Sequence, residues 1–251
     1  MIPYVVVPAI VPQVLWITGI LVAHGLWMRR VRTLGMDEGT AAGMSLAMVI
    51  SGIIGGRLFR LVYAPEEVWS GGLASFGGIA GGLIAAAVHI QRQRKGWTDG
   101  VRYLDALAAV FPLGWIVGRM GCSLAHDHPG ARSTSWLAVG YPGGSRFNLG
   151  VVEVVFLGLV MIPVWGLLAR RVWPPGFLLG LTLAVYGAFR LALDALHADP
   201  PRYLEVTVDQ WAYGTALFCG LAILGRVFRR RGVDFGGRGK RVALAPRPEN
   251  R

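Results

Sequence analysis

Long apolar stretches follow one another along most of the chain, separated by short polar segments. Each holds about 20 predominantly apolar residues, enough for an α-helix to cross the hydrocarbon core of a membrane. Backbone polar groups in lipid must be hydrogen-bonded within their own segment, so these stretches are expected to be helices. The pattern predicts an all-α integral membrane protein with seven transmembrane helices at residues 8–28, 41–62, 72–91, 103–121, 149–169, 176–196 and 207–226.

The predicted spans belong to a single transmembrane helical domain over residues 1–231. The first apolar stretch continues to Met28 without a basic leading region or a small-residue cleavage site, so we expect it to remain as a membrane helix. The third span is rich in Gly and Ala, which permits close helix packing in a membrane. Residues 232–251 are polar and Gly-rich, and they are expected to be a disordered, basic cytoplasmic tail.

Basic residues cluster after alternate spans and predict the orientation of the chain. The clusters are Arg29, Arg30 and Arg32; Arg92, Arg94 and Lys95; Arg170 and Arg171; and Arg226, Arg229, Arg230 and Arg231. With seven spans they share one side, and the opposite loops carry Glu66, Glu67, Asp127, Asp199 and Glu205. Cytoplasmic loops are enriched in Lys and Arg, so this pattern places the N-terminus outside (periplasmic) and the C-terminus in the cytoplasm.

Composition agrees with a membrane protein. The 251 residues are 54% hydrophobic and 16% charged, whereas soluble domains have roughly 25% charged residues. The net charge of +11 comes from residues in short loops between spans, so membrane topology explains it and no nucleic-acid partner is predicted. Cys122 and Cys219 show neither a CxxC spacing nor the density of a disulfide framework.

Ionisable residues inside predicted spans are costly, so each is a candidate functional residue. Arg190 and Asp194 lie four residues apart, on one helical face and within ion-pair reach. The pair could simply neutralise itself, or Arg190 could bind an anionic lipid phosphate while Asp194 fixes its orientation. Arg57 follows two glycines that leave room for another backbone or a head group, although it could instead extend to lipid phosphates at the interface. Arg119 is flanked by Gly118 and lies near the end of the fourth span.

Glu153 lies about one turn inside the fifth span, where Asn148 could cap the helix. A carboxylate at that depth needs a cationic partner, and the outer-face arginines are the available ones. Arg57, Arg119 and Arg190 come from three helices that could converge, with Glu153, Asp194 and Asp127 as acidic counterparts. Such a group suits a phospholipid head group, because arginine binds phosphate bidentately.

The sequence His126-Asp127-His128 has the composition of a metal site. Three adjacent residues do not converge easily on one ion, and no further Cys or His has a suitable spacing. A polar outer loop is therefore favoured, and no metal site is predicted.

Six motifs occur in an order typical of one family. They are GGRLFRLVY at 55–63, SFGGIAGG at 75–82, GRMGCSLAHDHPG at 118–130, LGVVE at 149–153, YGAFRLALD at 186–194 and VDQW at 208–211. Over roughly residues 15–226 the sequence resembles the prolipoprotein diacylglyceryl transferases of the bacterial inner membrane. This resemblance implies transfer of a diacylglyceryl group from phosphatidylglycerol to the lipobox cysteine thiol of a prolipoprotein signal peptide, with release of glycerol phosphate. It also implies a site open to the outer leaflet among membrane lipids, with no metal or other cofactor.

The resemblance carries over by motif to particular residues. The implied catalytic residues are Arg119, Arg190, Asp194 and Asp127. The implied phospholipid-binding residues are Arg57, Arg119, Gly77, Gly78, Cys122, Gly130, Glu153 and Gln210. The chain departs from the family at Gly77, where the family has His, and at Cys122, where the signature has Asn.

These departures leave alternatives open. His126 or His128 could supply the missing base. The chain could instead act on another acceptor, or bind lipid without catalysis. A transporter is disfavoured because the sequence shows neither an inverted repeat nor a pair of broken helices. The oligomeric state is not predicted.

Overall fold

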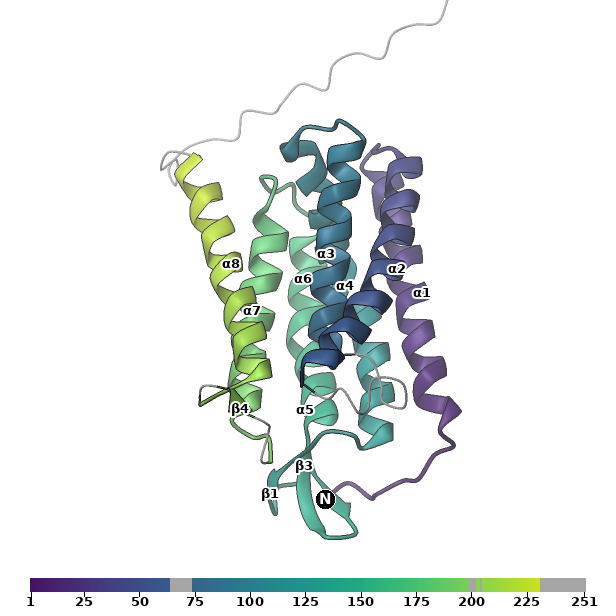
Figure 1. The fold of residues 1–251 in the computed structure, drawn as a ribbon, viewed down its shortest axis with the longest axis vertical. Coiled ribbons are helices and arrows are strands. Elements are labelled where there is room, and N and C mark those ends of the chain that lie inside the picture. The colour runs from purple at the N-terminus through teal and green to yellow at the C-terminus, as the bar shows by residue number, and fades with distance from the viewer. Residues whose placement is uncertain (64–73, 199–201, 204, 231–251) are drawn as a thin grey trace, which may run out of the picture.

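The protein is a bundle of helices that run roughly side by side, with a small sheet at one end (Figure 1). The computed structural model describes residues 1–63, 74–198, 202–203 and 205–230. The helices are α1 (Ile10–Thr33), α2 (Glu38–Tyr63), α3 (Ser75–Arg92), α4 (Trp97–Ala125), α5 (Leu149–Phe156), α6 (Ile162–Leu168), α7 (Phe177–Asp194) and α8 (Val208–Arg230). A π-helical turn, Leu157–Met161, joins α5 to α6.

Six described helices are long and apolar enough to cross a membrane: α1, α2, α4, the continuous α5 to α6 segment, α7 and α8. The 18-residue α3 runs alongside them and corresponds to the expected third span at 72–91, part of which lies outside the described residues. The protein is therefore mostly helical, as predicted. The expected tail, residues 232–251, and the loop acids Glu66, Glu67 and Asp199 also lie outside the described residues.

Glycines allow neighbouring helices to pack in pairs. In the pair of α2 and α3, a Cβ added at Gly55 would overlap the carbonyl oxygen of Gly77 and lie 3.2 Å from Gly81 Cα. In the pair of α7 and α8, a Cβ at Gly220 would lie 2.5 Å from the backbone nitrogen of Ala184. Such close backbone approach is typical of membrane helices, which gain stability from van der Waals packing.

A small antiparallel sheet is an addition to the expected all-helical fold. Its strands are β1 (Pro129–Arg132), β2 (Ala138–Tyr141) and β3 (Gly144–Asn148), in the order β1-β3-β2. The N-terminal segment joins it through hydrogen bonds from Ile2 N to Ala138 O (2.8 Å) and from Gly140 N to Ile2 O (3.1 Å). A second pair, β4 (Arg202–Tyr203) and β5 (Val206–Thr207), precedes α8. Residues predicted to be a polar loop thus form a folded cap on the bundle.

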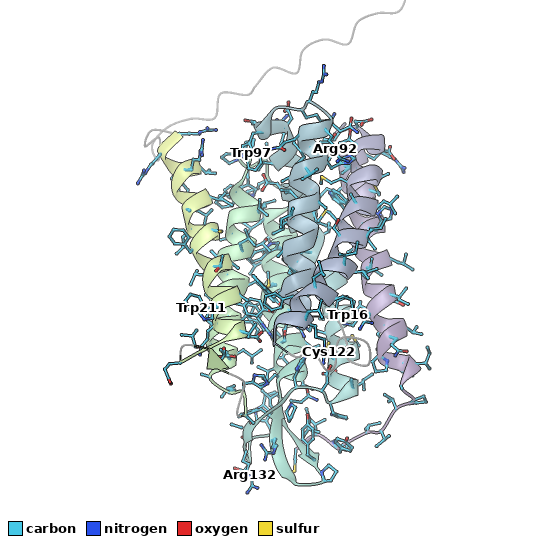
Figure 2. The ribbon with its side chains drawn as sticks, in the orientation of Figure 1. Trp16, Arg92, Trp97, Cys122, Arg132 and Trp211 are labelled. Carbon is cyan, nitrogen blue, oxygen red and sulfur yellow. The ribbon has the colours of Figure 1, made fainter. Side chains whose placement is uncertain are left out.

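Tryptophans mark the two ends of the bundle. Trp16 and Trp211 lie on opposite flanks near the end that carries Cys122, whereas Trp97 lies with Arg92 at the other end (Figure 2). Trp211 and Trp97 are more than half exposed. Tryptophan is enriched where the apolar core of a membrane meets its head groups, so Cys122 lies close to the level of one interface.

Glycine packing in the pair of α2 and α3 gives a stability prediction. Gly55→Ala should destabilise the protein by about 1–3 kcal/mol, because the added methyl group forces the two helices apart. Thermal unfolding of the purified protein in detergent measures the effect. Gly25→Ala is the matched control, because a Cβ there meets nothing within 4 Å. Equal stability of the two variants would contradict the close packing.

Candidate functional site

Glu153 lies at the centre of the site, and the start of α5 places it there. The side-chain oxygen of Asn148 accepts a hydrogen bond from Val151 N (3.3 Å), and its amide group donates to Ser123 O on α4 (2.8 Å). This cap, predicted from the sequence, fixes the first turn of α5 against α4. Glu153 follows on the face turned toward the other helices and is 0% exposed.

Two arginines from different helices bind the Glu153 carboxylate. Arg119 Nε of α4 donates to Oε1 (2.9 Å), and Arg190 Nη1 of α7 donates to Oε2 (2.8 Å). We call Arg119, Glu153 and Arg190 the Arg–Glu–Arg triad. The expectation that Glu153 pairs with arginines of other helices is confirmed. All three side chains are buried, so each depends on the others for charge compensation.

Aromatic side chains surround the triad and hold it in place. Trp115 Nε1 donates to Glu153 Oε1 (3.0 Å), and the Tyr186 hydroxyl donates to the same oxygen. The guanidinium of Arg119 lies 5.3 Å from the Trp115 ring, and that of Arg190 lies 4.6 Å from the Tyr213 ring. The sequence reasoning missed these aromatics, because their apolar bodies fit the hydrophobic pattern and only their polar tips serve the site.

Each guanidinium group of the triad has an N–H donor that is not hydrogen-bonded to a described residue. Arg119 Nη2 and Arg190 Nε are buried and have no hydrogen-bond partner among the residues that the structure describes. Buried N–H groups normally have partners, so a site with two such donors favours an anionic ligand.

Asp209 is a second carboxylate partner of Arg190, and sequence reasoning missed it. Arg190 Nη2 donates to its carboxylate at 2.8 Å. A capping box presents Asp209: Thr207 N donates to the Gln210 side chain (3.2 Å), and Gln210 N donates to Thr207 Oγ1 (3.0 Å). The Thr-x-x-Gln spacing was a sequence signal for this cap. It gives Gln210, expected to bind phospholipid, a structural position at the start of α8.

The suggested pairing of Arg190 with Asp194 is corrected by these contacts. Asp194 accepts a hydrogen bond from Thr207 Oγ1 (3.0 Å) and lies 3.9 Å from His197 Nδ1. Its four-residue spacing from Arg190 allowed a pair, but Glu153 and Asp209 on neighbouring helices occupy the guanidinium. Asp194 instead supports the residue that caps α8.

Arg57, Gly77 and Gly78 lie on α2 and α3. The main packing partners of α2 are α3 and α1, whereas the triad lies on α4, α5 and α7. The convergence of Arg57 with the triad stays a prediction. A Cβ at Gly77 would overlap the Gly55 carbonyl oxygen and lie 2.5 Å from Phe59 Cβ. The helix spacing therefore leaves no room for a histidine side chain where the related family carries one.

Cys122, Asp127 and His128 form a cluster at the end of α4. One possible ligand atom from each lies within 4.8 Å of the others. The sequence predicted no further metal ligand for the loop that holds the two histidines. This prediction was wrong, because the structure places Cys122 close to Asp127 and His128. Cys122 Sγ also lies 3.7 Å from Arg119 Nη1, so the cluster adjoins the triad.

The two loop histidines have different environments. His126 contacts Val5 O through Nε2 (3.0 Å) and the Asn148 amide through Nδ1 (3.0 Å), so both ring nitrogens have partners. Burial lowers the pKa of His128, although the carboxylate of Asp127 opposes this shift. Both ring nitrogens of His126 are therefore engaged, whereas His128 Nε2 only approaches Asp127 Oδ1 at 3.7 Å.

Gly130 connects the sheet to the end of α7. A Cβ there would lie 2.7 Å from Leu196 O, and the next residue, Ala131, donates its N–H to that same oxygen (2.7 Å). Its small size thus holds β1 against the end of α7.

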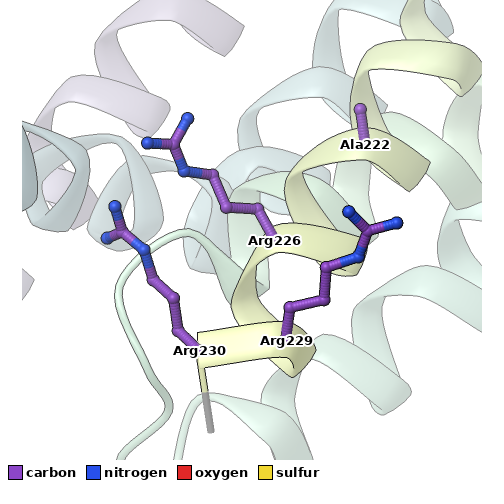
Figure 3. Close-up of a pocket in the computed structure, with 5 residues that line it drawn as sticks. Ala222, Arg226, Arg229 and Arg230 are labelled. Carbon is purple, nitrogen blue, oxygen red and sulfur yellow. The ribbon is translucent and has the colours of Figure 1, made fainter. Parts of the chain in front are cut away.

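Two hollows lie away from the triad. A groove of about 670 Å³ runs between α2 and α3, lined by apolar residues and glycines, with His89 and Arg92 among its lining residues. A basic pocket of about 400 Å³ lies at the C-terminal end of α8, where Figure 3 shows Arg226, Arg229 and Arg230. The groove suits an acyl chain, and the basic pocket suits an anionic head group.

The bundle of long apolar helices defines a polytopic helical membrane protein, with two buried arginines that share one carboxylate. Residues 13–226 match the family model for prolipoprotein diacylglyceryl transferase, and the chain belongs to this family. The resemblance found in the sequence motifs is confirmed.

Similar proteins cover most of the chain. A protein from Symbiobacterium thermophilum is 27% identical over 238 residues, covering 83% of this chain and 85% of its own. One from Chromohalobacter salexigens is 28% identical and covers 88% of each chain. One from Leifsonia xyli subsp. xyli is 29% identical, covering 83% of this chain and 71% of its own. Each is named phosphatidylglycerol–prolipoprotein diacylglyceryl transferase.

Removing the central carboxylate tests the triad. Glu153→Ala should lower the free energy of unfolding by about 3–5 kcal/mol, because it leaves two buried guanidiniums without their shared counterion. Thermal unfolding in detergent, followed by tryptophan fluorescence, measures the loss. Glu38→Ala is the control, since its ion pair with Arg32 is exposed and should contribute less than about 1 kcal/mol. A similar small loss in both variants would show that the triad is not a major source of stability.

Proposed function

We propose that this protein transfers the diacylglyceryl group of phosphatidylglycerol to the lipobox cysteine thiol of a prolipoprotein, with the Arg–Glu–Arg triad at the lipid phosphate. Family membership and the names of the relatives support the reaction. The observation that carries the site is the pair of buried guanidiniums held on one carboxylate, with Nη2 of Arg119 and Nε of Arg190 unpartnered among the described residues.

The triad suits the charge changes of this reaction. The acceptor sulfur forms a bond to the glyceryl carbon while the bond from that carbon to the phosphate oxygen breaks, and the thiol proton is released to solvent. Negative charge develops on the departing glycerol phosphate, where preorganised guanidinium donors stabilise it. The Glu153 carboxylate already accepts hydrogen bonds from Arg119, Arg190, Trp115 and Tyr186, so it positions the arginines and does not take the proton.

The proposal includes a membrane orientation. Seven spans, formed by α3 and the six long apolar segments, give one domain with its N-terminus outside and its C-terminus in the cytoplasm. The basic ends of α1, α3, α6 and α8 lie opposite the end that carries Cys122 (Figures 1 and 2), which supports this orientation. The site then opens toward the outer leaflet of the bacterial inner membrane, where secreted prolipoproteins arrive.

The remaining candidate residues have proposed roles around this centre. Asp127 faces the acceptor from the loop after α4, and Asp194 positions α8 through Thr207. Arg57 and the glycines Gly77 and Gly78 border the lipid path, and the groove between α2 and α3 holds an acyl chain.

Conservative replacement of the arginines tests this function. Arg119→Lys and Arg190→Lys should each lower thioether formation by about 10²–10³-fold, because lysine cannot keep the contact with Glu153 and also bind phosphate through a planar fork. The assay uses purified protein, phosphatidylglycerol in detergent micelles and a lipobox peptide, with mass spectrometry of the product.

Arg102→Lys is the control for this assay, since Arg102 is exposed and pairs only loosely with Asp99 at 3.9 Å. Full activity in both triad variants would exclude the triad as the phosphate site. A folded wild-type protein that binds phosphatidylglycerol but gives no thioether would instead favour another acceptor or a non-catalytic lipid-binding role.

A further inference from the structure

The end of α4 brings three different metal-ligand types together. His126 follows Ala125 with a φ of 53°, in the left-handed region, so the helix ends and the chain changes direction. This turn brings Asp127 and His128 close to Cys122 in the last turn of α4, with one ligand atom of each within 4.8 Å of the others. His128 Nε2 lies 3.7 Å from Asp127 Oδ1.

We propose that Cys122, Asp127 and His128 bind a zinc ion and leave its fourth coordination position open. Thiolate, carboxylate and imidazole are all zinc ligands, and three protein ligands with one open position are typical of catalytic zinc. Ligand atoms bound at about 2.0–2.3 Å in a tetrahedron lie roughly 3.3–3.8 Å apart. The 3.7 Å from His128 Nε2 to Asp127 Oδ1 lies within this range, and all three ligand atoms lie within 4.8 Å of one another.

The surroundings suit a metal ion. Arg119 Nη1 lies 3.7 Å from Cys122 Sγ, and a neighbouring guanidinium favours the thiolate form that binds metal. The thiolate and the Asp127 carboxylate together balance the charge of the ion, and Arg119 has its own counterion in Glu153. His126 is held by Val5 and Asn148, which leaves His128 as the histidine ligand of this loop.

The role of the ion rests on the proposed transferase function. The acceptor thiol occupies the open position and releases its proton to solvent, because a thiol bound to zinc is deprotonated. Its sulfur attacks the glyceryl carbon, the bond from carbon to phosphate oxygen breaks, and the phosphate leaves on the side of the triad. Arg119 contacts both Glu153 (2.9 Å) and Cys122 (3.7 Å), so one side chain adjoins the leaving group and the nucleophile.

The ion also accounts for how this chain could form the acceptor thiolate. A free thiol has a pKa near 8.5 and supplies little thiolate at neutral pH. Gly77, where the related family has a histidine, is buried in the contact between α2 and α3 and cannot supply a base. Coordination to zinc makes a separate base unnecessary.

Metal binding is tested on the full chain, purified in detergent. Zinc content after dialysis is measured by mass spectrometry, and cobalt(II) replaces zinc as a spectroscopic probe. Wild-type protein should retain about one equivalent of zinc and show a thiolate-to-cobalt charge-transfer band. Cys122→Ser should abolish that band, and Asp127→Asn and His128→Gln should weaken zinc binding by at least about tenfold. Cys219→Ser and His24→Gln are the matched controls and should bind metal as wild type does.

The outcomes separate the metal site from the transferase function. A folded wild-type protein with neither zinc nor a cobalt band overturns the proposal, as does undiminished cobalt binding by Cys122→Ser. Transfer that stops on chelation and resumes with added zinc supports the proposed role. Transfer by fully metal-free protein that His128→Gln abolishes would make His128 a general base and overturn the role of zinc. Stoichiometric zinc without any thioether product would support the site and contradict the transferase function.

Discussion

The shared counterion at Glu153 is the interaction on which the site depends. Its carboxylate has no contact with solvent and binds guanidiniums from α4 and α7, so it fixes both the separation and the orientation of the two arginines. Two guanidiniums in a low-dielectric bundle would repel each other and resist insertion without it. The Asn148 cap places Glu153, and Tyr186 and Trp115 complete its shell. The Arg–Glu–Arg triad is therefore made of contacts between helices, and α4, α5 and α7 must pack correctly on one another for it to form.

Arg119 links this triad to the end of the bundle. One edge of its guanidinium is bound to Glu153, and another faces Cys122 in the next turn of α4. The helix thus presents an anion-binding group and a thiol at neighbouring positions, near the level that Trp16 and Trp211 mark as an interface. The proposed reaction places the lipid phosphate and the acceptor thiol together at this end of α4.

Periodicity and charge predicted most of this architecture, and the remainder depended on contacts between segments. The apolar stretches, the Asn148 cap and the need of Glu153 for a cation were all visible in the sequence. The second partner of Arg190, Asp209, was not, because a spacing of four residues to Asp194 is local information, whereas Asp209 comes from another helix. The contact of Tyr186 with Glu153 was not predicted either, because Tyr186 lies in an apolar stretch and fits its hydrophobic pattern. The cluster of Cys122 with Asp127 and His128 depends on the left-handed residue His126, which no periodicity predicts.

Gly77 shows how packing and chemistry constrain each other in this chain. The carbonyl oxygen of Gly55 and the Cβ of Phe59 occupy the space that any side chain at position 77 would need, so α2 and α3 approach as closely as their backbones allow. A histidine at 77 would require the helices to separate, with a loss of the packing that holds them together in lipid. The chain therefore cannot regain a base there by a single substitution. Activation of a thiol has to come from groups outside the contact between α2 and α3, and the residues at the end of α4 are the ones that lie beside Arg119.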